Sequence, residues 1–131
     1  MITAERVLEV SGRKDKNEGF KGTNINLSIT DVKVDGETIE MGYEYTVNYE
    51  EKMGMLRIKG VITAKEDKKL AESVRSEWMK SQKLPDDYAG VILSFINFSG
   101  AVNGTPIAKE LGLPAPFVQF MPQRIQLPKG K

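Results

Sequence analysis

The N-terminal half of the chain contains three stretches in which apolar and polar residues alternate, residues 25–34, 39–49 and 56–64. Alternation with a period of two is typical of a β-strand that buries one face and exposes the other. A shorter stretch, residues 5–11, alternates only approximately and predicts a modest strand at the edge of a sheet. The sequence therefore predicts four strands.

The connections between these strands can also be predicted. The phase of the alternation changes inside residues 25–34, because Ile29 and Val32 lie on positions of opposite parity. A β-bulge near Asp31 would absorb the extra residue. Asp35-Gly36 is a strong signal for a tight turn, and Lys52-Met53-Gly54 supplies a second turn. Such short turns join antiparallel neighbours.

The spacing of the apolar residues changes after residue 66, where Leu70, Val74 and Trp78 recur at every fourth position. This spacing is typical of a helix with one apolar stripe. Asp67 precedes it and is a residue type that caps the first turn of a helix. We expect this helix to end near residues 81–83.

A second helical segment, residues 88–102, is apolar on almost every side. A helix that is apolar most of the way round needs cover on two sides. Proline in a helix interior costs about 3 kcal/mol or more, so the Asn-Gly-Thr-Pro segment at 103–106 predicts an interruption. We expect a kink or a break at Pro106, and a close approach of the backbone to a neighbouring molecule at Gly100 and Gly104 is a compatible interpretation.

Together these elements predict an α+β fold, a four-stranded antiparallel sheet with two C-terminal helices packed on one face, in a single domain of residues 1–131. The tail, residues 117–127, is expected to run extended. If the sheet covers one side of the apolar helix, the other side must contact another subunit or a partner. The expected oligomer interface consists of Ile92, Phe95, Ile96, Phe98, Val102 and Pro106.

The composition excludes several kinds of chemistry. The 131 residues include no cysteine and no histidine, so the chain lacks thiolates, disulfides, the commonest metal ligand and the usual general base. The adjacent carboxylates at 86–87 and at 50–51 do not share a helix or strand face, and the glycines of residues 100–105 lack the lysine of a phosphate loop. We therefore expect no enzyme activity, no cofactor and no metal site.

Charge and hydropathy restrict the partners. The formal net charge of +1 gives no long-range attraction to nucleic acid, and the basic loop at residues 13–21 is diluted by acidic residues. Polar and small residues interrupt the apolar helix before the roughly 20 apolar residues that a membrane span requires. The N-terminus lacks the basic start and apolar core of a secretion signal. We expect a soluble, cytoplasmic protein that does not insert into membranes.

Three tyrosines, Tyr43, Tyr45 and Tyr49, share one face of a predicted strand with Met41 and Val47. Burial beneath the helices is the usual position of such residues. An exposed surface of aromatic and methionine side chains would instead suit adaptable binding of apolar segments. The sequence leaves both interpretations open.

The order of the elements and the last third of the chain resemble the SecB family of bacterial export chaperones and its shorter archaeal relatives. The resemblance covers roughly residues 6–127. It is carried most strongly by Asn103, Pro106, Ala108, Lys109 and Glu110. A proline-containing segment at residues 113–116 and an apolar tail that ends in Pro-Gln-Arg-Ile at 122–125 also match the family.

This resemblance implies a dimer of dimers that acts as an ATP-independent holdase and binds non-native or extended polypeptides in apolar grooves. The residues that it assigns to polypeptide binding are Tyr43, Tyr45, Trp78, Phe117, Phe120 and Met121. SecB proteins are acidic and engage the secretion motor through an acidic surface, whereas this chain has a net charge of +1 and no acidic tail. The difference argues against docking to that motor.

A second hypothesis belongs to a different class. The chain would then be a non-catalytic structural or interaction subunit that uses its apolar helix only for self-association. Both hypotheses predict a homo-oligomer, a dimer or a tetramer, and only the first predicts that unfolded or extended polypeptides bind. A third class, an enzyme with a small ligand beneath the helices, finds no support in the residues.

Overall fold

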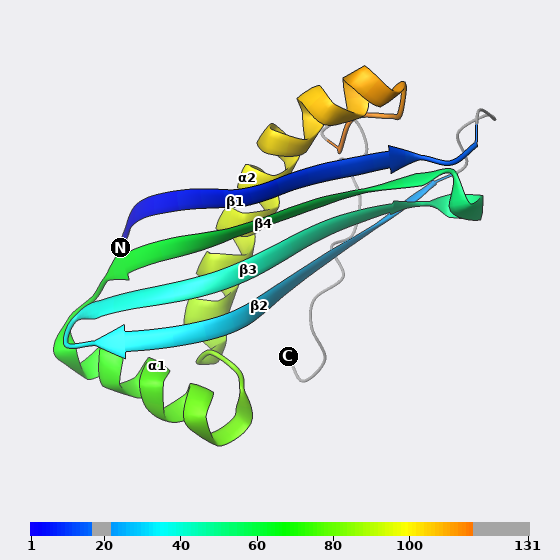
Figure 1. Ribbon diagram of the computed structural model, residues 1–131. Coiled ribbons are helices and arrows are strands. Elements are labelled where there is room, and N and C mark those ends of the chain that lie inside the picture. Colours follow the sequence, from blue (N-terminus) through cyan, green and yellow to red (C-terminus); the bar gives the residue numbers. More distant parts are fainter. Residues whose placement is uncertain (17–21, 117–131) are drawn as a thin grey trace.

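A computed structural model describes residues 1–16 and 22–116 of the chain (Figure 1). Along the sequence its elements are β1 (Ile2–Lys14), β2 (Thr23–Asp35), β3 (Thr38–Tyr49), a single 3-10 turn (Glu50–Lys52), β4 (Gly54–Lys65), α1 (Lys68–Ser81) and α2 (Asp86–Leu111). The predicted α+β fold, with a four-stranded antiparallel sheet followed by two helices, is confirmed.

The four strands form one sheet in the order β1-β4-β3-β2, and every neighbouring pair is antiparallel. Hairpins join β2 to β3 and β3 to β4, whereas β1 pairs with β4 and lies at one edge of the sheet. The predicted bulge is present, because the register between β2 and β3 shifts between Ile29 and Asp31. The shift lets Ile29 and Val32 oppose Tyr43 and Met41, two buried residues of β3.

The strand β1 is longer than the alternation at residues 5–11 predicts, since it runs from Ile2 to Lys14. Most of its side chains are exposed. A strand with little buried surface has no need to alternate apolar with polar residues, so its sequence marks its bounds only weakly. Its position at a sheet edge is confirmed.

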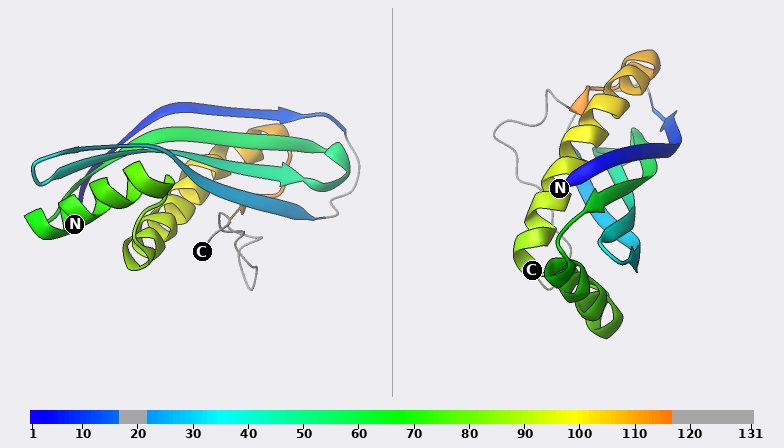
Figure 2. Two further views of the ribbon diagram at one scale, coloured as in Figure 1. Left: turned by 90° about the horizontal axis from the view of Figure 1, so that it is seen from below. Right: turned by 90° about the vertical axis from the view of Figure 1, so that its left-hand side faces the viewer.

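Both helices lie on the same face of the sheet, with α1 beside β2 and α2 running across the strands (Figures 1 and 2). This face of the sheet is the apolar one. The alternate side chains of β3 that point to the helices are fully buried, which confirms that they form the core: Ile39, Met41, Tyr43, Tyr45, Val47 and Tyr49. The core therefore lies between one sheet face and one helical layer.

The first turn of α1 is capped as the sequence predicts. The side chain of Asp67 accepts a hydrogen bond from the backbone N–H of Leu70 at 2.8 Å. The helix ends at Gln82, which adopts the left-handed conformation and donates its backbone N–H to the carbonyl of Trp78. Ala71 and Val74 are its buried residues, so α1 covers the sheet with a single stripe.

The predicted interruption of the second helix at residues 103–106 is wrong, because α2 continues through Pro106 to Leu111 and is capped by Gly112. Pro106 has no N–H for the carbonyl of Val102. Packing on both sides of the proline offsets that loss: Gly104 and Ala108 are buried, and Ile107 packs against the core. Tertiary contacts thus override the local cost of proline here.

Candidate functional site

The helix α2 has two different faces, and its inner face is sealed against the sheet. The buried residues of this face are Ala89, Ile92, Leu93, Ile96, Gly100, Gly104 and Ala108. Small residues recur among them, and small side chains allow a helix backbone to approach the layer beneath it. The inner face is therefore part of the core of this protein.

Gly100 marks the closest approach of α2 to the sheet. A Cβ atom at this position would lie 2.3 Å from ring atoms of Tyr45, a distance that real Cβ atoms do not show. Only glycine lets the helix rest on this ring. The interpretation that Gly100 provides a close approach to a neighbouring molecule is wrong, because the contact is with the protein's own β3. Gly104 likewise faces Leu56, Ile58 and Pro116 of the same chain.

A polar cluster joins α2 to β1 and β3 beneath the helix. The Glu5 carboxylate accepts hydrogen bonds from the Tyr43 hydroxyl and, at 2.6 Å, from the Ser99 hydroxyl. Asn103 donates to the Ser99 hydroxyl oxygen at 3.2 Å and to the Ser99 carbonyl at 2.9 Å. Burial, together with the Glu5 carboxylate, raises the pKa of Tyr43. These bonds fix the position of α2 over the edge strand β1.

The tyrosines proposed for polypeptide binding lie inside the core. Tyr43 is 1% exposed and Tyr45 is 0% exposed, which confirms the interpretation of these residues as core packing. Burial raises the pKa of Tyr45, and its hydroxyl has no hydrogen-bond partner among the residues that the structure describes. Polypeptide binding at Tyr43 and Tyr45 stays a prediction, and it would require α2 to move away from the sheet.

The other residues proposed for polypeptide binding lie elsewhere. Trp78 is half-buried on α1, which packs beside β2, and its neighbour Met79 is 75% exposed. The structure therefore does not bring Trp78 together with the tyrosines beneath α2. Phe117, Phe120 and Met121 lie outside the described residues.

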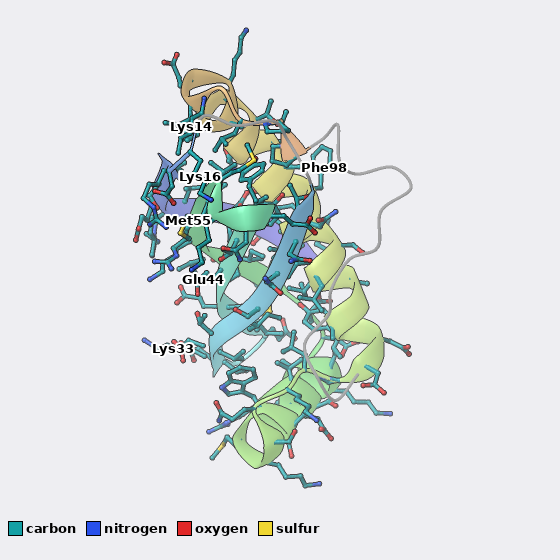
Figure 3. All side chains as sticks on the ribbon, turned by 90° about the vertical axis from the view of Figure 1, so that its right-hand side faces the viewer. Lys14, Lys16, Lys33, Glu44, Met55 and Phe98 are labelled. Atoms are coloured by element: carbon teal, nitrogen blue, oxygen red, sulfur yellow. The ribbon has the colours of Figure 1, made fainter. Side chains whose placement is uncertain are left out.

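The outer face of α2 is apolar and exposed. Val91, Phe98 and Val102 are 59%, 58% and 42% exposed, respectively, and Phe98 projects from the helix (Figure 3). Phe95 is half-buried and Pro106 is exposed beside them. We call Val91, Phe95, Phe98, Val102 and Pro106 the outer stripe. Helices bury such apolar residues when a second surface is available.

The outer stripe differs from the interface that the sequence predicts. Ile92 and Ile96 are fully buried against the protein's own sheet, so they cannot contact another subunit in this fold. Val91 was missed by the sequence analysis. Its seven-residue separation from Phe98, two helical turns, places both residues on one side of the helix and was the signal that could have found it.

The edge strand β1 carries a second group of exposed apolar side chains, Val7, Leu8 and Val10. The register between β1 and β4 shifts between Val7 and Glu9, so Leu8 has no partner residue on β4. Leu8 is 61% exposed. An edge strand presents unpaired backbone groups to which an extended chain can bond. Both exposed apolar groups are thus suited to contacts with other polypeptides.

Among residues 1–16 and 22–116, no group of three or more acidic side chains is arranged to hold a metal ion. Within the same residues, α2 has the length and composition of a membrane span. Half of its most apolar segment is buried inside the fold, as in the core helix of a folded domain.

No family model matches the sequence, and no curated protein matches it either. A solved structure does: a SecB-like chaperone of Mycobacterium tuberculosis in complex with a ChAD peptide from the HigA1 antitoxin. The match has a TM-score of 0.55 at 9% sequence identity and covers 88% of this chain and 82% of that chain. At this identity the likeness concerns the fold, and the chain has the SecB-like fold.

Proposed function

We propose that this protein is an ATP-independent, holdase-type chaperone that binds non-native or extended polypeptides as a homo-oligomer in the cytoplasm. A holdase needs only exposed apolar surface that binds the unfolded chain reversibly and in preference to the native one. It requires no catalytic group, cofactor or nucleotide. The chemistry available to a chain without cysteine or histidine is sufficient for this role.

The observation that carries the proposal is the amount of apolar surface that the fold leaves uncovered. Val91 and Phe98 on α2 and Leu8 on β1 are all more than half exposed, although the sheet and helices bury a complete core. Contiguous exposed apolar groups are typical of surfaces that bind other polypeptides. The SecB-like chaperone with the same fold, solved with a bound peptide, supports this interpretation.

Two kinds of contact are assigned to different residues. The outer stripe of α2 mediates self-association, with Phe95, Phe98, Val102 and Pro106 retained from the sequence prediction. Polypeptide binding is assigned to Trp78 on α1 and to Phe117, Phe120 and Met121 of the C-terminal tail. Tyr43 and Tyr45 take part only in a conformation in which α2 has moved.

The direct test is suppression of aggregation. A chemically denatured test protein is diluted into buffer with the purified chain at stoichiometric amounts, without nucleotide, and light scattering is followed. We expect the scattering to fall as the chain is added, and added ATP to change nothing. Unchanged scattering at a several-fold excess of the chain contradicts the proposal.

Variants locate the polypeptide site. The combined substitution F117S/F120S/M121S and the single substitution Trp78→Ala are both expected to weaken binding of a fluorescent unfolded polypeptide, measured by anisotropy. Trp78→Phe, which keeps an aromatic ring, is the matched control and should bind nearly as well as the unmodified chain. Equal affinity in all four proteins would remove the site from these residues.

The alternative function is a structural subunit whose apolar helix serves only self-association. The burial of Tyr43 and Tyr45 favours it, because the largest aromatic surface of the fold is then unavailable to clients. An oligomer that is stable in light scattering, and that binds neither unfolded chains nor hydrophobic dyes, would establish the alternative and exclude the holdase.

A further inference from the structure

The outer stripe of α2 ends in charges of opposite sign. Asp87 lies eleven residues before Phe98 and Lys109 lies eleven residues after it, and both side chains are exposed. Eleven residues make about three helical turns, so Asp87, Phe98 and Lys109 lie on one side of the helix, with each charge about 16 Å from the phenyl ring. Val91 and Val102 lie between them on the same side. The stripe is therefore apolar in its middle and oppositely charged at its two ends.

We propose that two copies of this chain associate through the outer stripe with their α2 helices antiparallel, about a two-fold axis that passes beside Phe98. This inference rests on the self-association in the proposed function and gives it a geometry. A two-fold axis places the same surface of each copy in the interface, so every contact occurs twice. Phe98 then meets Phe98 of the partner subunit at the centre.

Charge complementarity selects the antiparallel arrangement. With Phe98 at the axis, Asp87 lies opposite Lys109 of the partner subunit, and the reciprocal pair forms at the other end. A parallel pair would instead place Asp87 beside a second Asp87 and Lys109 beside a second Lys109, and like charges repel. The helix dipoles also favour the antiparallel pair, because the acidic N-terminus of one α2 then lies beside the C-terminus of the other.

The neighbouring charges do not disturb this pairing. Asp86 and Glu110 are adjacent in sequence to Asp87 and Lys109, and each helical step turns the side chain by about 100°. Asp86 and Glu110 therefore point to different sides of α2 from the stripe and from each other. Only the two residues with complementary charges lie in line with Phe98.

The positions of the charges also determine the crossing angle. At the shallow crossing of about 20° that is common in helix bundles, points 16 Å from the axis are offset by only about 6 Å, which a lysine side chain spans. At the steeper class near 50° the offset is on the order of 14 Å and neither pair can form. The proposal therefore commits to a shallow crossing.

Charge reversal tests the arrangement in the full-length chain. The dissociation constant of the oligomer is measured by analytical ultracentrifugation for Asp87→Lys, for Lys109→Asp and for the double variant D87K/K109D. Each single reversal is expected to weaken association about tenfold at low salt and less at high salt. The double variant should return to within about threefold of the unmodified chain, although it carries the helix-end cost of both substitutions.

Two results of this experiment overturn the proposal. Single reversals without effect mean that Asp87 and Lys109 do not face each other across the interface, as in a parallel pair. A double variant as weak as the single variants means that each substitution acts through its own helix. Melting curves at low protein concentration identify any variant that fails to fold, and Phe98→Cys then replaces it as the test.

The chain has no cysteine, so Phe98→Cys introduces a single thiol. A thiol beside a two-fold axis should give a disulfide-linked dimer under mild oxidation. Met79→Cys, which is equally solvent-exposed but lies on α1, is the matched control and should remain monomeric on denaturing gels. Equal yields of cross-linked dimer from both variants, or none from Phe98→Cys, overturn the proposal.

These results are independent of chaperone activity. A dimer that cross-links through residue 98 but does not suppress aggregation contradicts the holdase proposal and leaves this arrangement intact. A chain that suppresses aggregation but has the native mass of a monomer contradicts the arrangement alone.

Discussion

The two faces of α2 belong to one helix and are both apolar, yet they have different surroundings. On the inner face, Ile96 and Gly100 are buried against the sheet, and the helix lies in direct contact with the ring of Tyr45. On the outer face, Val91 and Phe98 are more than half exposed. Apolar character alone therefore does not distinguish a face that completes the core from one that is available to another molecule.

Residue size distinguishes the two faces better. Glycine and alanine occur on the buried side of α2, where the backbone must approach the sheet: Ala89, Gly100, Ala101, Gly104 and Ala108. The outer stripe consists of larger side chains that project from the helix. Small residues thus indicate the side of an all-apolar helix that packs within its own chain, and the following experiments test this distinction.

The largest effect is expected from high pH, which acts on the inner face. Burial raises the pKa of Tyr49 to about 12 and raises the pKa of Tyr43, Tyr45 and Tyr88 as well. Tyrosines of the unfolded chain ionise near 10, so their contribution to stability is complete below pH 10 and is lost as the pH rises through 12. Circular dichroism should show cooperative unfolding in this interval. A fold that is equally stable at pH 9 and pH 12 would contradict the burial of these hydroxyls.

The next largest effect is expected from truncation of a buried side chain. Ile96→Ala removes a fully buried side chain and should lower the free energy of unfolding by about 3 kcal/mol, since the cavity adds to the lost burial. Val91→Ala on the outer face is the matched control and should change it by less than about 0.5 kcal/mol at concentrations where the chain is monomeric. Urea titrations measure both values. Equal losses would show that the two faces are equivalent.

Glycine substitutions give a smaller effect of opposite sign on the two faces. Gly100→Ala places a methyl group against the ring of Tyr45 and should destabilise the fold by about 2 kcal/mol. Gly90→Ala adds a methyl group where no other atom lies within 4 Å, and should stabilise the helix by up to about 1 kcal/mol. Thermal melting compares the two variants. A stabilised Gly100→Ala protein would mean that α2 does not contact β3.

The smallest effect is expected from removal of single hydroxyl groups. Tyr43→Phe removes a hydrogen bond to the Glu5 carboxylate and should lower stability by about 1.5 kcal/mol. Tyr45→Phe removes a buried hydroxyl that has no partner among the described residues, and should raise stability by about 1 kcal/mol. Differential scanning calorimetry detects shifts of this size. If both variants lost stability, Tyr45 would have a partner after all.

The sequence predicts the central strands and α1 well, because there the physical cause is local. The change of phase between Ile29 and Val32 requires a bulge, and Asp67 caps a helix wherever the next turn exposes its N–H groups. The edge strand β1 is predicted too short, because exposed side chains need no pattern. The continuation of α2 through Pro106 is missed, because its cause is packing of Ile107 and Ala108 on elements that are distant in sequence.

The candidate site is predicted only in part. The sequence correctly indicates that α2 has more apolar surface than one sheet covers, and Phe98 and Val102 are indeed exposed. It cannot tell which way the helix is turned about its axis, so it assigns Ile92 and Ile96 to the wrong face. That rotation is set by the contact between Gly100 and Tyr45 and by the hydrogen bonds to Glu5, which join residues far apart in the chain.

The strand order β1-β4-β3-β2 has a consequence for the assembly of the molecule on the ribosome. The three strands β2, β3 and β4 are sequential neighbours and can zip together through short hairpins. The first strand to be synthesised, β1, must wait for the last one before it finds a hydrogen-bonding partner. Closing a long loop in this way is slow, because contacts between distant residues form only after much chain entropy is lost. Until β4 emerges, the nascent β1 therefore remains an unpaired ribbon that carries Leu8 and Val10 into solvent.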